Sequence, residues 1–349
     1  MESLNYYPKI KEIGNIINIW SRQTLTPVGK ITIIKTLIIS KLNHLFLTLP
    51  TPCNTTLKQL IHTLYSFIWE NKPDKIKRKI LCLEHKFGGL KMLDIEEYIK
   101  GLKLTWVRRL LKNNTKLKKL IESTENINIE DLVFLGPPNK CKNPFWKDVF
   151  KAWTEMQYKL KPKNEEEFLT MVFKIKKKFD WKKVHNMSFY TTKSSKLHWF
   201  QYRIVHRIIG TNEFLFKIKV KQSDKCTFCN EAIEDIEHIF WTCHKISDLW
   251  IELGDWIYNQ TQILIPVNID IILFGNLGYN GNDRIKNLII LLTKFYIYRT
   301  KLCENIVNFT GLKNYLKESL VLEKNLFFKR KPFHKANICW DPWLPILED

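Results

Sequence analysis

Apolar side chains that return every three or four residues constrain this chain more than any other feature. The clearest run follows Thr26 and Pro27, where a capping hydroxyl and a proline at the first helical position predict a helix start. Its apolar positions are Val28, Ile31, Ile34, Leu37, Ile38, Leu42 and Leu45. This spacing predicts an amphipathic helix, which Pro50 and Pro52 should end. The pattern indicates a mainly α fold.

Further helix signals continue along the chain. A second apolar stripe comprises Leu57, Leu60, Ile61, Leu64, Phe67 and Ile68. Gly88 and Gly89 predict a turn, and Asp94 with Glu97 resembles a capping box that starts a third helix. Ser194 can cap another helix, whose apolar face we expect to hold Leu197, Phe200, Ile204 and Ile208. The Trp/Pro-rich residues 340–345 suggest an irregular docked tail.

The glycine and prolines of residues 136–140 interrupt these patterns and mark the best linker candidate. We therefore predict a helical domain over 1–135, and a linker with a basic helical connector over 136–193. A small helical domain with a zinc knuckle should follow over 194–260. A helical tail should complete the chain over 261–349.

The chain is strongly basic, with a formal net charge of +21. Such an excess of Lys and Arg points to a polyanionic partner, most often nucleic acid. The alternative is an ordinary basic protein whose lysines are merely solvated. No stretch of about 18 uncharged apolar residues occurs, so we predict no membrane partner. The N-terminus lacks the form of a signal peptide, which favours the cytoplasm, the nucleus or both.

The basic residues gather in three segments, 72–79, 101–120 and 174–183. Positions 101–120 carry seven basic residues and no acid, which favours a phosphate-facing surface over a merely solvated helix face. The candidate phosphate contacts are Lys75, Lys77, Arg78, Lys79, Arg108, Arg109, Lys112, Lys116, Lys176, Lys177, Lys178 and Lys182. Trp106, Phe179 and Trp181 could stack on bases beside them. For the third segment, an ordinary amphipathic helix end is an equally good interpretation.

One constellation carries specific chemistry. Cys226 and Cys229 form a Cys-x2-Cys pair, followed by His238 and, after four residues, by Cys243. Thiolates and imidazole are the ligands that zinc prefers, and four of them make a closed structural site. His244 adjoins Cys243 and could replace it as the fourth ligand. A redox Cys-x2-Cys is the alternative, but the βαβ setting of such motifs is not visible here.

The predicted zinc is structural, because four protein ligands leave no position for an activated water. Phosphate-loop, nucleophile-elbow and zinc-protease motifs do not occur in the sequence, and no two aspartates are adjacent. We therefore expect no catalytic residue in this chain. The five other cysteines are scattered, and most should be small buried hydrophobes.

Several segments, in their order, resemble the region that follows the palm in non-LTR (LINE-type) retrotransposon reverse transcriptases. Residues 20–30 read WSRQTLTPVGK, and the similarity returns in residues 49–52, 67–69, 75–78, 88–90, 143–146, 195–199 and 294–298. The set Cys226, Cys229, His238 and Cys243 resembles that family's zinc-binding domain, which is usually followed by a Trp such as Trp250. The resemblance spans nearly the whole chain.

The resemblance implies a thumb-like helical domain over 1–135 and a reverse-transcriptase zinc-binding domain over 194–260. It also implies that polymerase and endonuclease centres lie outside this chain. We therefore expect a Zn²⁺-containing fragment that binds RNA or DNA with little sequence specificity, alone or beside a reverse transcriptase supplied in trans. The alternatives are a zinc-stabilised protein-interaction module and a non-functional retrotransposon remnant.

Overall fold

The computed structural model describes residues 2–112, 123, 143–157, 180–277, 281–329 and 339–348, with side chains undescribed at 2–3, 107–112, 153–157, 281–282 and 348. Within these ranges the regular elements are helices, and the β contact recorded is an isolated bridge between Lys225 and Ile233. The mainly α prediction is confirmed. The predicted linker at 136–140 lies outside the described residues.

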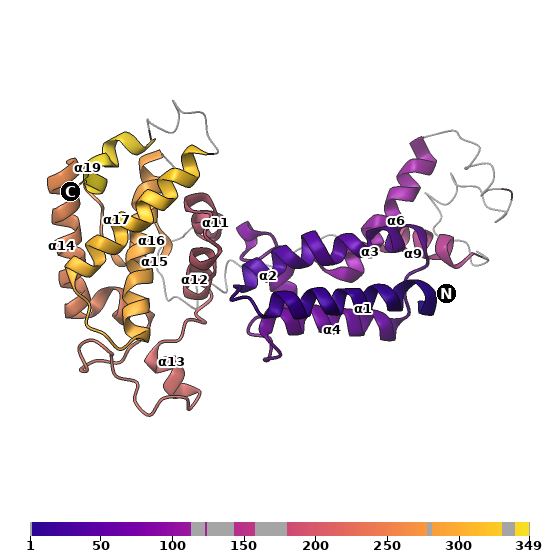
Figure 1. The fold of residues 1–349 in the computed structure, drawn as a ribbon, viewed down its shortest axis with the longest axis horizontal. Helices are drawn as coiled ribbons and strands as arrows, with labels where there is room; N and C mark the ends of the chain where they lie inside the picture. The colour runs from indigo at the N-terminus through magenta and orange to yellow at the C-terminus, as the bar shows by residue number, and fades with distance from the viewer. Residues whose placement is uncertain are drawn as a thin grey trace. The chain divides into compact units, whose positions relative to one another are not determined.

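The chain divides into two compact units (Figure 1). We call Met1–Glu84 with Gly89–Lys176 the N-terminal unit, and His85–Gly88 with Lys177–Asp349 the C-terminal unit. Residues 194–260 and 261–349 thus belong to one unit. The four domain boundaries given above stay predictions.

The N-terminal unit is a set of packed helices. These are α1 (Glu2–Ser21), α2 (Pro27–Ile33), the π-helix η1 (Ile34–Ile38), α3 (Ile39–Thr48), α4 (Asn54–Trp69), α5 (Arg78–Cys82), α6 (Ile95–Lys112) and α9 (Pro144–Gln157). Helix α1 contacts α3 and α4, and α6 packs against α3 and α9. Their apolar stripes close one core.

The helix starts follow the predicted chemistry. The Thr26 hydroxyl accepts a hydrogen bond from Gly29 N at the start of α2, with Pro27 as the first helical residue. The Asp94 carboxylate accepts from Glu97 N at the start of α6. Since a side-chain acceptor satisfies a backbone N–H that the helix leaves unpaired, these caps fix where each helix begins.

The run Pro27–Thr48 has the length and composition of a membrane-crossing helix. Core helices pass the same test, and one side of this run packs into the unit, while Leu37 is exposed. Ile34, Ile38, Leu42 and Phe46 are completely buried against neighbouring helices. The run ends at Thr48, two residues before Pro50, as predicted.

Lys103 of α6 is buried inside the N-terminal unit, and Trp106 of the same helix is half-buried. The Lys103 ammonium donates to Leu49 O and sits 4.1 Å from the centroid of the Phe145 ring. Burial lowers the pKa of Lys103 to about 8. Trp106 donates its indole N–H to Leu47 O and packs edge-on against Phe145. Lys103, one of the seven basic residues at 101–120, therefore does not belong to a phosphate-facing surface. The base-stacking role of Trp106 stays a prediction.

The C-terminal unit begins with the short 3-10 helix η2 (His85–Phe87) and continues from residue 180. Its other helices are α11 (Trp181–Thr191), α12 (Ser195–Val205), α13 (Asn212–Lys217), η3 (His238–Thr242), α14 (His244–Thr261), α15 (Ile269–Phe274), α16 (Gly281–Leu302), α17 (Phe309–Phe328), η4 (Asp341–Trp343) and α19 (Leu344–Glu348). Ser194 caps α12 as predicted, accepting from Leu197 N.

Helix α16 is the centre of this unit. It contacts α11, α12, α15, α17 and η3, and residues 288–292 are all buried. Lys294 is fully buried as well, and its ammonium donates to Gln201 Oε1 at 2.7 Å. Since α12 ends at Val205, the expected fourth member of its apolar face, Ile208, lies beyond the helix.

The last residues were expected to form an irregular docked tail. The chain does dock, because Trp340 and Trp343 are almost completely buried. It is not irregular, because residues 341–348 form η4 and α19, and α19 packs on α14 and α17. The prediction about the scattered cysteines also fails in part, since Cys53 and Cys303 are exposed.

Candidate metal centre

Four predicted ligands converge at one point of the C-terminal unit. Cys226 Sγ, Cys229 Sγ, a ring nitrogen of His238 and Cys243 Sγ all lie within 4.8 Å of one another. The sulfurs of Cys226 and Cys243 are 3.9 Å apart, and Cys229 Sγ lies 3.4 Å from His238 Nε2. Ligand atoms at ~2.0–2.3 Å from a tetrahedral zinc lie roughly 3.3–3.8 Å apart. The donor set and its spacing therefore fit Zn²⁺.

The first two ligands sit on a tight knuckle. Cys226 N donates to Ala232 O at 2.9 Å, and Asn230 N donates to Cys226 O at 2.9 Å. Asn230 has a left-handed backbone with φ of 58°, a conformation that asparagine tolerates well. The amide of Phe228 points at Cys226 Sγ, 3.4 Å away. The turn thus presents both sulfurs to one side.

The other two ligands are brought together by a π-helical turn. His238 and Cys243 are five residues apart, and Cys243 N donates to His238 O at 3.0 Å across η3. This i→i+5 bond is the defining contact of a π-helix. The Trp250 indole N–H donates to Phe240 O at 2.8 Å and ties the turn to α14. The four residues between His238 and Cys243 thus form one π-helical turn, which brings the two ligand side chains to the same side.

The histidine ring is oriented by its neighbours. His238 N donates to Asp235 Oδ1 at 2.6 Å, and His238 Nδ1 lies 3.2 Å from Thr242 Oγ1. With Nδ1–H donating to the hydroxyl, the Nε2 lone pair points to the three sulfurs. A metal-bound histidine generally engages its second nitrogen in this way, which fixes the tautomer and the ring plane.

A buried ion pair anchors the knuckle to the unit's core. Glu234 is completely buried, and one of its oxygens lies 2.6 Å from Lys301 Nζ of α16. The same carboxylate accepts from Asn212 N at 2.9 Å and from Thr227 N at 2.8 Å. Thr227 follows Cys226 directly, so this carboxylate holds the first ligand loop in place. Neither Glu234 nor Lys301 was singled out in the sequence.

The sulfur pair explains why the group favours a cation. The sulfur of Cys243, which lies close in space, lowers the pKa of Cys226 to about 5. The sulfur of Cys226 and burial in turn raise the pKa of Cys243. Two thiolates 3.9 Å apart repel each other, so only one ionises readily. A divalent cation between them allows both to ionise and to act as ligands.

His244, the alternative fourth ligand, is placed elsewhere. Its ring groups with Cys229 and Glu231, with Nδ1 4.0 Å from Glu231 Oε2, and half of the side chain is exposed. Cys243, by contrast, has no exposed surface and lies within the four-ligand group.

The candidate phosphate contacts that the structure describes are on the surface. In the N-terminal unit Lys75, Lys77 and Lys79 are exposed, and Arg78 pairs with Asp74 at 2.7 Å. In the C-terminal unit Lys182 is exposed. Lys116, Lys176, Lys177 and Lys178, and the side chains of Arg108, Arg109 and Lys112, lie outside the described residues.

The predicted base-stacking role of Trp181 was wrong. The side chain is only 2% exposed and packs edge-on against Phe274, so neither ring face can accept a base. Phe179 lies outside the described residues. The next exposed aromatic side chain along the chain is Tyr190, nine residues after Trp181.

These features define a small helical region built around a Cys3His group. Residues 165–250 match the family model described as zinc-binding in reverse transcriptase. All four candidate ligands, and Trp250, lie inside the matched range. The match supports a reverse-transcriptase-related zinc-binding region in this chain.

Proposed function

We propose that the chain is a nucleic-acid-binding part of a LINE-type reverse transcriptase, built around a structural zinc ion. The observation that carries the proposal is the Cys3His group inside the range matched by the reverse-transcriptase zinc-binding family. In this proposal the N-terminal unit corresponds to the thumb-like region.

The zinc would be held by Cys226, Cys229, His238 and Cys243. It would have a structural role, cross-linking the loop that carries Cys226 and Cys229 to the π-helix η3. Four protein donors fill a tetrahedral site and leave no position for a reacting water. The matched family is described as zinc-binding in reverse transcriptase, which agrees with this role for the ion. We therefore propose a binding role without a catalytic centre in this chain.

The proposed ligand is RNA or DNA, bound with little sequence preference, in the cytoplasm or nucleus. The net charge of +21 and the exposed lysines at 75, 77, 79 and 182 suit a phosphate backbone. Binding could occur alone or beside a reverse transcriptase supplied in trans. No membrane partner is part of this proposal.

Fluorescence anisotropy across a salt series tests it. Labelled RNA and DNA should bind the zinc-loaded chain. The affinity should fall steeply as the salt concentration rises, because counterion release then contributes less free energy to binding. Cys226→Ser should weaken binding. The matched control is Cys303→Ser, which removes an exposed cysteine far from the ligand group in sequence and should bind as wild type. A folded, zinc-loaded chain with no affinity at low salt would refute the proposal.

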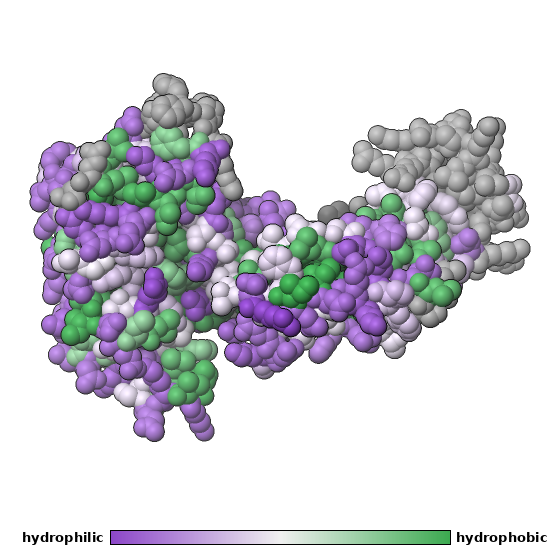
Figure 2. Space-filling model, viewed as in Figure 1, coloured by the Kyte–Doolittle hydropathy of each residue, from purple (hydrophilic) through white to green (hydrophobic). Residues whose placement is uncertain are grey.

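One observation favours the second candidate, a protein-interaction module. Helix α13 and the residues after it expose Phe214, Phe216, Ile218 and Val220, between 38% and 67% of each side chain. Figure 2 shows an apolar patch where α13 lies in Figure 1. Apolar patches of this kind often mark protein contacts. Under this candidate, Phe216→Lys would abolish a nuclease-resistant complex and leave nucleic-acid affinity unchanged.

A further inference from the structure

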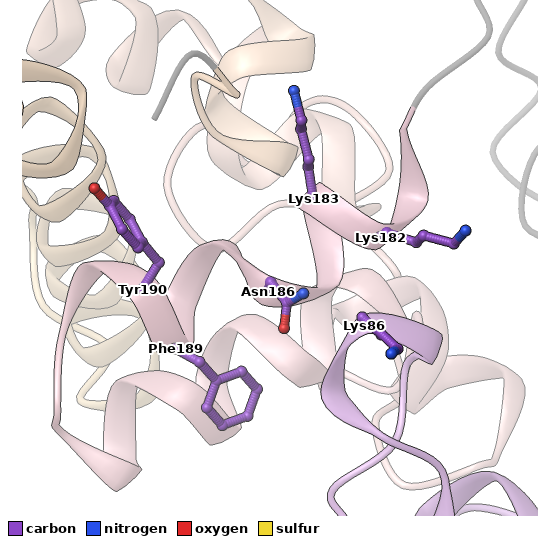
Figure 3. Close-up of a pocket in the computed structure, with 6 residues that line it drawn as sticks. All are labelled: Lys86, Lys182, Lys183, Asn186, Phe189 and Tyr190. Carbon is purple, nitrogen blue, oxygen red and sulfur yellow. The ribbon is translucent and has the colours of Figure 1, made fainter. Parts of the chain in front are cut away.

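A shallow groove of about 520 Å³ lies on the surface of the C-terminal unit (Figure 3). Its lining residues are Lys86, Lys182, Lys183, Asn186, Phe189 and Tyr190. Five of them belong to α11, and Lys86 comes from η2. The groove is separate in sequence from the Cys3His group at 226–243.

The fold of α11 explains why these side chains share one side. Val184, Met187 and Thr191 are buried, which leaves residues 182, 183, 186 and 190 on the outer side. Helical spacing repeats every three to four residues, so those positions form a strip roughly 12 Å long. Asp180 caps the helix, accepting from Lys183 N.

Glycine 88 lets η2 reach this strip. Its φ is +78°, and a Cβ there would meet the His185 ring at 3.0 Å. Because a side chain would be strained and crowded at this position, Gly88 permits the close approach that brings Lys86 beside α11. His85 stacks on Phe189 with ring centroids 3.6 Å apart, which fixes the contact.

The lining combines two kinds of chemistry. Lys86, Lys182 and Lys183 are exposed ammonium donors, and no carboxylate lines the groove. Phe189 contacts the rings of His85 and His198, with centroids 3.6 Å and 4.4 Å away, and is half-buried. Tyr190 differs from it, since 45% of its side chain is exposed. Arg284 Nε donates to Tyr190 O at 3.4 Å and holds this end of the helix.

We infer that this groove binds a single strand of nucleic acid, with phosphates on Lys86, Lys182 and Lys183 and one base stacked on Tyr190. The inference rests on the proposed nucleic-acid binding and assigns it to one surface. A strip of cations beside an exposed ring suits a single strand, whose bases are free to stack on protein. Paired bases in a duplex present no free face, so duplexes should gain only the phosphate contacts.

The test compares two triple variants of the full chain by anisotropy with single-stranded RNA, single-stranded DNA and duplex DNA. The groove variant is Lys86→Ala, Lys182→Ala and Lys183→Ala. The matched control, Lys217→Ala, Lys245→Ala and Lys329→Ala, removes the same charge from exposed lysines outside the groove. Circular dichroism and zinc content check that both variants fold.

For single strands, the groove variant should lower the magnitude of the slope of log K against log salt by about 2, as expected for three lost phosphate contacts. The control should change the slope by clearly less. Tyr190→Leu should weaken single-strand binding about tenfold without changing the slope, and Tyr190→Trp should retain wild-type affinity. Duplex affinity should be unaffected by Tyr190→Leu.

Equal losses in the two triple variants would show that net charge alone matters and would overturn the assignment of this groove. So would a groove variant that binds like wild type, while the proposed nucleic-acid function would stand. Absence of binding by the wild-type chain would overturn both. A preference for RNA or DNA would identify which single strand the groove takes.

Discussion

The α3 helix and the knuckle segment 223–235 are stabilised in opposite ways. In α3, Ile39, Leu42, Leu45 and Phe46 are buried against neighbouring helices. In residues 223–235 the buried side chains are Cys226 and Glu234. Burial of apolar surface stabilises the first, at roughly 25 cal/mol per Å². The second has almost no such surface, so we propose that a metal and the buried Glu234 carboxylate supply its stability.

Removal of the metal should produce the largest contrast between the two regions. Cys226→Ser, or chelation, should abolish zinc binding and unfold residues around 223–243, because metal binding at such sites contributes on the order of 10 kcal/mol to local folding. Hydrogen exchange of these amides should accelerate by orders of magnitude. Exchange in α2, α3 and α4 should not change, since their core is apolar.

Cys53→Ser supplies the control for that experiment. Cys53 is exposed and lies in the N-terminal unit, so its removal should leave zinc content and exchange at 223–243 as in wild type. Protection of 223–243 that survives in the Cys226→Ser variant would contradict a metal-dependent knuckle.

Breaking the buried ion pair should give the next largest effect. The Glu234 side chain is 0% exposed, so Lys301→Ala leaves a fully buried carboxylate without its lysine partner. This variant should destabilise the C-terminal unit by about 3–5 kcal/mol. Zinc affinity should fall about 10–100-fold, because the same carboxylate holds Thr227 N in the ligand loop. Denaturant unfolding and competition with a chromophoric chelator measure the two effects.

Lys217→Ala is the matched control, since Lys217 pairs with Glu213 on the surface at 2.5 Å. An exposed pair one helical turn apart contributes only ~0.3–0.5 kcal/mol. Similar losses in the two lysine variants would mean that the Glu234 pair has no special part in the knuckle.

Acid should destabilise the C-terminal unit through two histidines. Burial lowers the pKa of His185 to about 3, with nearby His206 adding to the effect, and lowers the pKa of His206 to about 4. An unfolded histidine titrates near ~6.5. Stability present at neutral pH is therefore lost as pH falls from 6.5 toward 4, by about 2 kcal/mol per histidine at pH 5.

Between pH 7 and pH 5, the free energy of unfolding should fall by about 2 kcal/mol less in His185→Leu than in the wild-type protein. The protonation of the zinc ligands affects both proteins alike, so the difference between them isolates His185. Urea unfolding followed by the fluorescence of the unit's buried tryptophans would measure it. Parallel pH curves for the two proteins would contradict a buried, neutral His185.

The smallest expected effect concerns the N-terminal unit alone. Thr26→Ala removes the hydroxyl that caps α2 and should cost about 1 kcal/mol. Thr26→Ser keeps the acceptor and should restore most of it. Urea unfolding should detect the loss, and zinc content should stay at the wild-type value. A loss of zinc in this variant would contradict the independence of the two regions.

The sequence predicted what depends on short spacings. The caps at Thr26, Asp94 and Ser194 follow from neighbouring residues, and so does the proximity of Cys226, Cys229, His238 and Cys243. Periodicity located most of the stripe of α2 to α3, because Ile31, Ile34, Ile38, Leu42 and Leu45 are buried, but the predicted member Leu37 is exposed. In these cases the side chain that decides the structure lies within a turn or two of its partner.

Contacts between distant segments were beyond sequence reasoning. Glu234 and Lys301 meet only because α16 passes behind the knuckle. Trp181 and Lys103 lie in segments whose basic and aromatic residues are typical of a nucleic-acid-binding surface. Each side chain is nevertheless buried against another helix: Trp181 contacts Phe274, and Lys103 contacts Phe145. The spacing of basic and aromatic residues cannot say which side of a helix faces the core.

X-ray absorption at the zinc edge of the purified chain tests the central claim most directly. A Cys3His site predicts one zinc per chain, with three sulfur ligands at ~2.3 Å and one nitrogen ligand at ~2.0 Å. Cys243→Ser should change the sulfur count, and His244→Ala should leave the spectrum unchanged. Two sulfurs with two nitrogens, an oxygen ligand from water, or a chain without stoichiometric zinc would contradict the account.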